Sequence, residues 1–117
     1  MPPKKPGLNI LMSPAKFWGA ELLPSAPVTA SRDLRIANRR GLHARASAKF
    51  AKMSGEFEAR VDVCKDDICV VGTSIMGLMM LGAAKGETVN IAASGSDAQQ
   101  AVDQLSALVE GKFGEDE

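Results

Sequence analysis

Alternating apolar and polar residues mark several short strands in the later part of the chain. Leu34 and Ile36 are the apolar positions of the first, and a polar turn at residues 65–67 separates the second from the third. Alternation with a period of two is typical of strands that bury one face, and a polar turn between two such runs indicates a hairpin. The predicted strands are residues 33–37, 57–63, 68–71 and 89–93.

Helical periodicity marks three further segments. In the first, Ala46, Phe50 and Met53 recur at the spacing that places side chains on one face of a helix. The last begins with Ser96-x-x-Gln99, a capping box whose side chains can satisfy free N–H groups at a helix start. The predicted helices are residues 44–54, residues 75–81 and a third from Ser96 to Gly111.

These elements follow the order β-α-β-β-α-β-α. Since the strands have one apolar face, helices must cover it, and the sequence predicts a two-layer α+β sandwich over residues 31–113. Residues 114–117 form an acidic tail. Residues 1–30 contain all six prolines and predict a disordered extension. Three alternatives remain for this extension. Its apolar residues could dock on a surface, it could be a transit peptide, or the start codon could be assigned too early.

Composition and charge exclude several functions. The 117 residues are 45% apolar and 24% charged, as in ordinary soluble domains. Fourteen basic and fourteen acidic residues give a net charge of zero, which argues against nucleic-acid binding. No apolar run approaches the roughly 20 residues that span a bilayer, so we expect a cytoplasmic protein without membrane insertion.

Cys64 and Cys69 are the only cysteines. They are too few for a zinc site beside a single histidine. They lie in predicted neighbouring strands, where a disulfide between them is conceivable. For a cytoplasmic protein, however, two reduced thiols are the favoured interpretation.

His43 is the only histidine and directly precedes the first predicted helix. Free N–H groups and the helix dipole favour negative charge there. No acidic residue lies between Leu34 and Gly55, whereas six basic residues do: Arg35, Arg39, Arg40, Arg45, Lys49 and Lys52. A lone histidine is usually structural, but these surroundings suit a phosphorylated imidazole stabilised by the helix start and Arg45. Hydrolysis is not expected without a nearby carboxylate or second base, although either could come from elsewhere in the fold.

Two motifs resemble those of HPr, the histidine-containing phosphocarrier family of the bacterial phosphoenolpyruvate-dependent phosphotransferase system. They are Gly41-Leu42-His43-Ala44-Arg45 and residues 73–86 around Ser74. The resemblance covers residues 31–113 and implies an open-faced sandwich with one four-stranded antiparallel sheet covered by three helices. Ala46 stands where the family commonly has proline, which affects only local rigidity. The residues of both motifs are most similar to those of HPr-type proteins in the nitrogen-related branch of Gram-negative bacteria.

The resemblance also implies roles. His43 would accept a phosphoryl group on Nδ1 from phospho-enzyme I and donate it to an enzyme IIA-type domain, and Arg45 would stabilise the group during transfer. Ser74 would be the position that HPr kinase/phosphorylase modifies in regulated members. The expected protein is a monomeric carrier without cofactor or metal, rather than an independent enzyme.

The segment from Ser74 onward allows two interpretations. Ser74 can simply cap the helix at residues 75–81, since a serine hydroxyl accepts from the first turn. Four apolar residues of that helix form either core or an adaptable docking patch for partners. They are Ile75, Met76, Met79 and Met80. The alternative function for the whole chain is a non-transferring regulatory module, switched by phosphorylation at Ser74, in which His43 is incidental.

Overall fold

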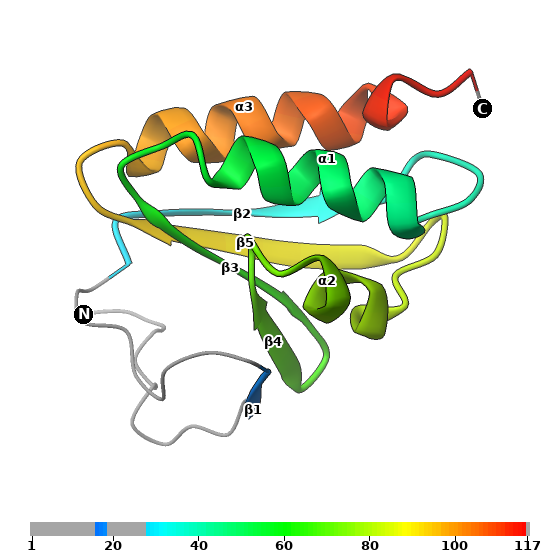
Figure 1. The fold of residues 1–117 in the computed structure, drawn as a ribbon, viewed down its shortest axis with the longest axis horizontal. Coiled ribbons are helices and arrows are strands. Elements are labelled where there is room, and N and C mark those ends of the chain that lie inside the picture. The colour runs from blue at the N-terminus through cyan, green and yellow to red at the C-terminus, as the bar shows by residue number, and fades with distance from the viewer. Residues whose placement is uncertain (1–15, 19–27, 117) are drawn as a thin grey trace.

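One sheet forms the centre of the computed structural model, which describes residues 16–18 and 28–116 (Figure 1). Its strands are β1 (Lys16–Trp18), β2 (Ala30–Arg35), β3 (Arg60–Lys65), β4 (Ile68–Val71) and β5 (Thr88–Ser94). They lie in the order β1-β4-β3-β5-β2. The pairings of β2 with β5, β5 with β3 and β3 with β4 are antiparallel, whereas β1 joins the β4 edge in parallel. The predicted four-stranded antiparallel sheet is therefore confirmed, and a fifth short strand extends it.

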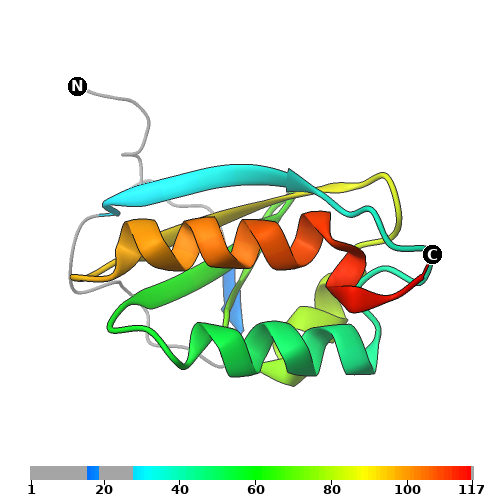
Figure 2. The ribbon, with the colours of Figure 1, turned by 90° about the horizontal axis from the view of Figure 1, so that it is seen from above.

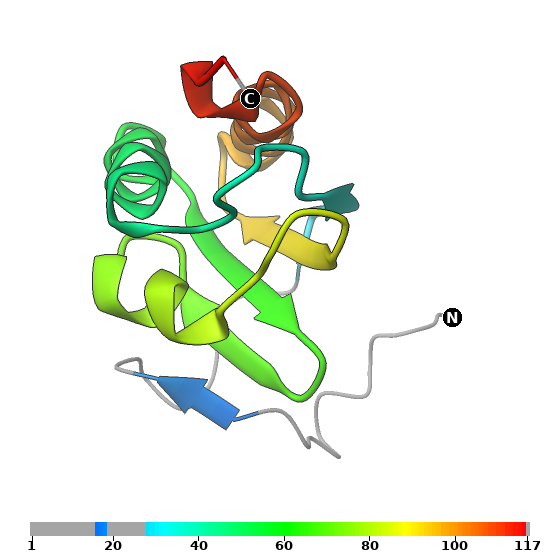
Figure 3. The ribbon, with the colours of Figure 1, turned by 90° about the vertical axis from the view of Figure 1, so that its right-hand side faces the viewer.

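Three helices cover one face of this sheet and leave the other face open (Figure 3). They are α1 (Ala44–Ser54), α2 (Ile75–Leu81) and α3 (Ala98–Glu110), and a 3-10 turn, η2 (Lys112–Gly114), follows α3. Figures 1 and 2 show α1 and α3 side by side, running in opposite directions. The α+β sandwich and the predicted β-α-β-β-α-β-α order are confirmed, with β1 in addition. Within the described part of the chain, no helix has the length and apolar character of a membrane span.

Strand β1 lies inside the N-terminal extension for which the sequence predicts disorder. It pairs Lys16 with Ile68 and Trp18 with Val70, and Ala30 at the other end of the extension begins β2, so four residues of the extension form regular structure. The rest of that prediction, for residues 1–15 and 19–27, lies outside the described residues.

The core between sheet and helices draws on every covering element. Phe50 of α1, Leu78 of α2, Leu105 of α3 and Ile91 of β5 are each at most 2% exposed and belong to one buried cluster. Burial of such a side chain stabilises the fold by about 1.5–3 kcal/mol relative to leaving it exposed. The helical periodicity identified this face of α1 correctly, since Ala46 is buried together with Phe50.

The start of α3 differs from the predicted capping box. Its N-cap is Asp97, and no side chain caps the helix there. The Asp97 carboxylate instead accepts the N–H of Glu58 at 2.8 Å, and the Ser96 hydroxyl lies 3.5 Å from the Glu58 carbonyl oxygen. Both side chains therefore bind the loop between α1 and β3 rather than the start of α3. The predicted end of the helix at Gly111 is confirmed.

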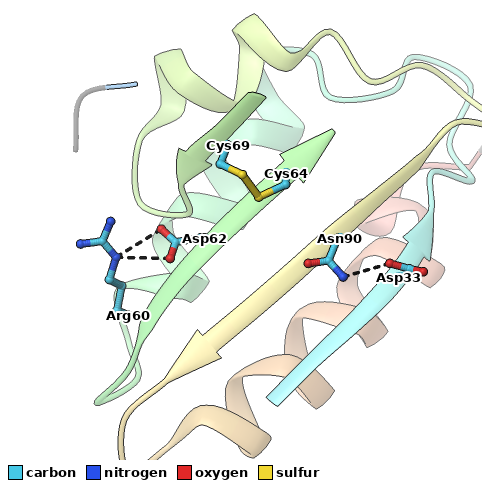
Figure 4. Close-up of a disulfide and its surroundings, with 6 residues drawn as sticks. All are labelled: Asp33, Arg60, Asp62, Cys64, Cys69 and Asn90. Atoms are coloured by element: carbon cyan, nitrogen blue, oxygen red, sulfur yellow. Dashed lines mark hydrogen bonds and ion pairs between the residues drawn. A yellow bond between two sulfur atoms is a disulfide. The ribbon is translucent and has the colours of Figure 1, made fainter. Parts of the chain in front are cut away.

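Cys64 and Cys69 form a disulfide that links β3 to β4 (Figure 4). The prediction of two reduced thiols is therefore wrong for this structure. It rested on the cellular compartment, whereas the hairpin register places the two residues directly opposite each other, with their Cα atoms 4.0 Å apart. Alternation along β3 puts Cys64 on the opposite face of the sheet from the buried Val63, away from the helices.

Candidate functional site

A tight loop between β2 and α1 fixes the position of His43. Asn38 is fully buried, and its Nδ2 donates to the Gly41 carbonyl at 2.9 Å, while the Gly41 N–H returns to the Asn38 carbonyl at 3.2 Å. The next N–H, of Leu42, donates to the Ala83 carbonyl at 3.0 Å just beyond α2. The loop that presents His43 is thus bound to the end of α2.

Gly41 permits this arrangement because it combines a left-handed backbone with a close approach. Its φ is +66°, and a Cβ there would lie 2.3 Å from the Ala83 carbonyl oxygen. We expect Gly41→Ala to lower the free energy of unfolding by at least about 2 kcal/mol, since the left-handed conformation alone costs roughly 1–2 kcal/mol for a non-glycine residue. Urea unfolding measures this. Gly82→Ala is the matched control: φ there is +63°, but no atom lies within 4 Å of the added Cβ. Equal losses in both variants would contradict the steric argument.

His43 is the N-cap residue of α1, with extended φ and ψ of −78° and −179°. Its carbonyl accepts the Ser47 N–H at 2.8 Å as the first helical hydrogen bond, so the N–H groups of residues 44–46 precede the ladder. Its side chain makes no capping bond and keeps 22% of its surface exposed. The imidazole is therefore available for chemistry at the positive end of the helix dipole.

The C-terminal segment supplies a carboxylate to this histidine. Glu115 Oε2 lies 2.5 Å from His43 Nε2, and Glu115 Oε1 accepts from Asn38 Nδ2 at 3.1 Å. Figures 1 and 2 show how this is possible, since the end of the chain lies beside the start of α1. Asn38, Glu115 and His43 thus form one hydrogen-bonded chain across two distant parts of the sequence.

These contacts lower the pKa of the Glu115 carboxyl below its ordinary value. The hydrogen bond from His43 is the largest cause, and Asn38 and Arg40 contribute, against a smaller opposing effect of desolvation. A lowered pKa means that the folded state favours the ionised carboxylate. The resulting stabilisation is present above the ordinary carboxyl pKa and is lost as the pH falls through the lowered one.

A short turn aims the C-terminal segment at the site. Phe113 is fully buried, and its carbonyl accepts from Lys49 Nζ of α1 at 2.7 Å. Lys112, Phe113 and Gly114 all have positive φ, at 59°, 56° and 80°. The first two are strained positions for non-glycine residues, which the buried ring and the lysine contact help to hold.

An open cavity of about 710 Å³ surrounds the imidazole, and most of its charged lining is basic. It is lined by Arg39, Arg40, His43, Arg45, Lys49, Gly114, Glu115 and Asp116. Within residues 28–116, no hydrogen bond or ion pair engages the Arg45 guanidinium. A free guanidinium and unpaired helix N–H groups beside an imidazole form a site for a transferable anionic group.

The structure brings together His43 and Arg45 but not Ser74, which does not line the cavity. Ser74 is the N-cap of α2, and its hydroxyl accepts the Gly77 N–H at 3.0 Å, so the predicted cap is confirmed. The sequence did not identify Asn38 and Glu115. A buried asparagine in a turn and one acid in an acidic tail have no local signal, because their roles arise only when the two chain segments meet.

A family model described as "PTS HPr component phosphorylation site" matches residues 30–111. The chain belongs to the HPr family. Phosphocarrier protein HPr of Neisseria meningitidis serogroup B is 46% identical over 86 residues, which cover 74% of this chain and 97% of that protein. Phosphocarrier protein NPr of Shewanella violacea is 38% identical over 84 residues, covering 72% and 92%. A phosphocarrier role in the phosphotransferase system follows in general terms, and assignment to the nitrogen-related branch stays a prediction.

Solved HPr structures agree with this fold. HPr-C-His from Thermoanaerobacter tengcongensis superimposes with a TM-score of 0.73 at 38% identity, covering 76% of this chain and all of that one. An HPr dimer from the same organism matches with a TM-score of 0.60 at 41% identity, covering 70% and 94%. Dimers therefore occur among HPr proteins, and the monomeric state of this chain stays a prediction.

Proposed function

We propose that His43 accepts a phosphoryl group from phospho-enzyme I and passes it to an enzyme IIA-type protein. The observation that supports this most directly is the placement of the only histidine at an open helix start within a basic cavity. In this proposal the protein is a cytoplasmic carrier without a cofactor. It transfers phosphoryl groups only while bound to its partner proteins.

In the proposed phosphoryl transfer, the attacking atom is the ring nitrogen of His43 that does not contact Glu115. Nε2 of His43 pairs with Glu115, whereas Nδ1 has no hydrogen bond to any described residue. In the forward step, the Nδ1 lone pair forms the N–P bond as the bond from phosphorus to the donor atom of enzyme I breaks. The Arg45 guanidinium and the helix N–H groups stabilise the transferring charge. In the second step, an acceptor nucleophile takes the group and the N–P bond breaks.

A reconstituted relay tests the proposal. The full-length protein is incubated with enzyme I and labelled phosphoenolpyruvate, and an enzyme IIA-type protein is then added. We expect acid-labile label first on this protein and then on the acceptor, with little transfer when this protein is omitted. Absence of label on the chain would favour the alternative of a non-transferring module.

For partner docking we propose the exposed side of α2. The helix divides cleanly: Leu78 and Leu81 are buried, whereas four large apolar residues are 42–73% exposed. These four, here called the α2 patch, are Ile75, Met76, Met79 and Met80. The helix that carries the patch is bound to the loop of His43, since the Leu42 N–H donates to the Ala83 carbonyl just beyond α2. An apolar patch beside basic residues suits a transient partner with an acidic rim.

We expect the Met76→Ala/Met79→Ala double variant to raise the KM for phospho-enzyme I about thirtyfold, because two interface contacts of roughly 1 kcal/mol each are lost. Its free energy of unfolding should change by less than about 0.5 kcal/mol, as usual for exposed positions. Steady-state transfer and urea unfolding measure the two effects. Leu78→Ala is the core control, with a stability loss of about 2–5 kcal/mol. Lost stability with an unchanged KM in the double variant would contradict docking.

Ser74 is the proposed regulatory position, for an HPr kinase/phosphorylase-type enzyme. Its hydroxyl is half-buried and engaged as a cap, yet it stands at the start of the α2 patch. A phosphate there would add negative charge beside apolar docking residues and weaken partner binding. Incubation with such a kinase and ATP tests this, since label at Ser74 is acid-stable and separable from label at His43.

A further inference from the structure

We propose that Glu115 is a positioning residue for His43, which holds the proton on Nε2 and keeps Nδ1 unprotonated for attack. This rests on the proposed function and adds a role for the tail that follows the domain. An ionised carboxylate can only accept hydrogen bonds, so its 2.5 Å contact assigns the proton to Nε2. In the Nδ1-protonated tautomer, by contrast, Nδ1 has no lone pair in the ring plane with which to attack phosphorus.

The carboxylate is itself held in place. Its second oxygen accepts from Asn38, whose Nδ2 also donates to the Gly41 carbonyl in the loop that presents His43. Asn38 is fully buried, and only 20% of the Glu115 side chain remains accessible. A rigid loop, a buried amide and a carboxylate therefore orient the ring together, as outer partners of a functional histidine do elsewhere.

The same contact matters for charge during transfer. When neutral His43 attacks through Nδ1, the ring keeps its Nε2 proton and becomes positively charged as the N–P bond forms. Glu115 then faces a cation rather than a neutral ring, so the interaction strengthens along the reaction. No proton leaves Nε2 at any point. When the group passes to the acceptor, the N–P bond breaks and its electron pair returns to Nδ1.

The tail offers a matched control. Asp116 is the next residue, lines the same cavity and carries the same charge, but it makes no hydrogen bond or ion pair within the described residues. If Glu115 acted only through its negative charge, Glu115→Gln and Asp116→Asn would change the transfer rate to a similar extent. A positioning role predicts an effect of Glu115→Gln alone, and partial rescue by Glu115→Asp.

Two readouts decide the proposal. The ¹⁵N chemical shifts of the His43 ring report which nitrogen holds the proton, and single-turnover transfer from phospho-enzyme I reports the rate. We expect Nε2 protonation in the wild type and in Asp116→Asn, and a mixture of tautomers in Glu115→Gln. The maximal rate of Glu115→Gln should fall about tenfold or more at unchanged KM, as for loss of a group that orients a base.

An unchanged tautomer ratio and rate in Glu115→Gln would overturn the proposal. A faster rate would do so as well, since it would show that the tail obstructs the histidine rather than positions it. The tautomer measurement needs no enzyme I. If the wild type fails to accept phosphate, the carrier function fails, while the ring shifts still show whether Glu115 sets the tautomer.

Discussion

His43→Ala is expected to accept no acid-labile phosphate from phospho-enzyme I, a loss of at least about a thousandfold relative to wild type, as when a catalytic nucleophile is removed. The sequence contains no second histidine that could substitute. The other nitrogen-bearing side chains at the cavity do not replace it, because a guanidinium has only donors and Lys49 Nζ donates to the Phe113 carbonyl.

The variant should remain folded, which makes the result interpretable. The His43 side chain caps no helix and lies partly in solvent, so its removal forfeits mainly the Glu115 contact. A single hydrogen bond of this kind contributes about 1 kcal/mol, measurable by urea unfolding. His43→Gln provides a second control that retains a polar side chain. Acid-labile label on either variant would remove His43 from the mechanism.

The apolar periodicities of this sequence predicted its helices, and the cap at Ser74 is confirmed, whereas the capping box at Ser96 is not formed. Residues 44–54 and 75–81 are α1 and α2 to the residue, because their apolar spacing matches a buried face. Strand β3 begins at Arg60 rather than at residue 57, since residues 57–59 belong to the loop fastened by Asp97. A capping motif states which side chains can bond to a helix start, whereas neighbouring loops decide which partner they bind.

The sequence predicted only those parts of the candidate site that lie close to His43 along the chain. A helix start, Arg45 and a run of basic residues are all visible around His43 in the sequence. The acid-free character of that stretch indicated no carboxylate near His43 in the sequence, and left open that one comes from elsewhere in the fold. Glu115 is such a carboxylate, and it lies 72 residues away along the chain. Its approach depends on a turn with positive φ at Lys112 and Phe113, a conformation that no propensity predicts for these residue types.

Phe113→Ala should have the largest effect on stability, a loss of about 3–5 kcal/mol, as is usual for a fully buried aromatic side chain. Phe113 is 0% exposed in the main core cluster, although it comes after the last α-helix, in the short 3-10 turn η2. We expect a correspondingly lower midpoint of urea unfolding. Phe113→Leu should retain most of the stability, because it keeps an apolar side chain of similar reach.

The same substitution connects packing to the site. The buried ring holds the turn whose next residues are Gly114 and Glu115, so its loss should release the carboxylate from His43 as well. In conditions where Phe113→Ala is still folded, its ring tautomers should resemble those of Glu115→Gln, whereas Phe113→Leu should resemble the wild type. Lys112→Gly separates strain from packing: it removes an unfavourable φ of 59° and should stabilise the turn by up to about 1 kcal/mol without altering the tautomer. Wild-type tautomers in a folded Phe113→Ala would show instead that Glu115 reaches His43 without this anchor.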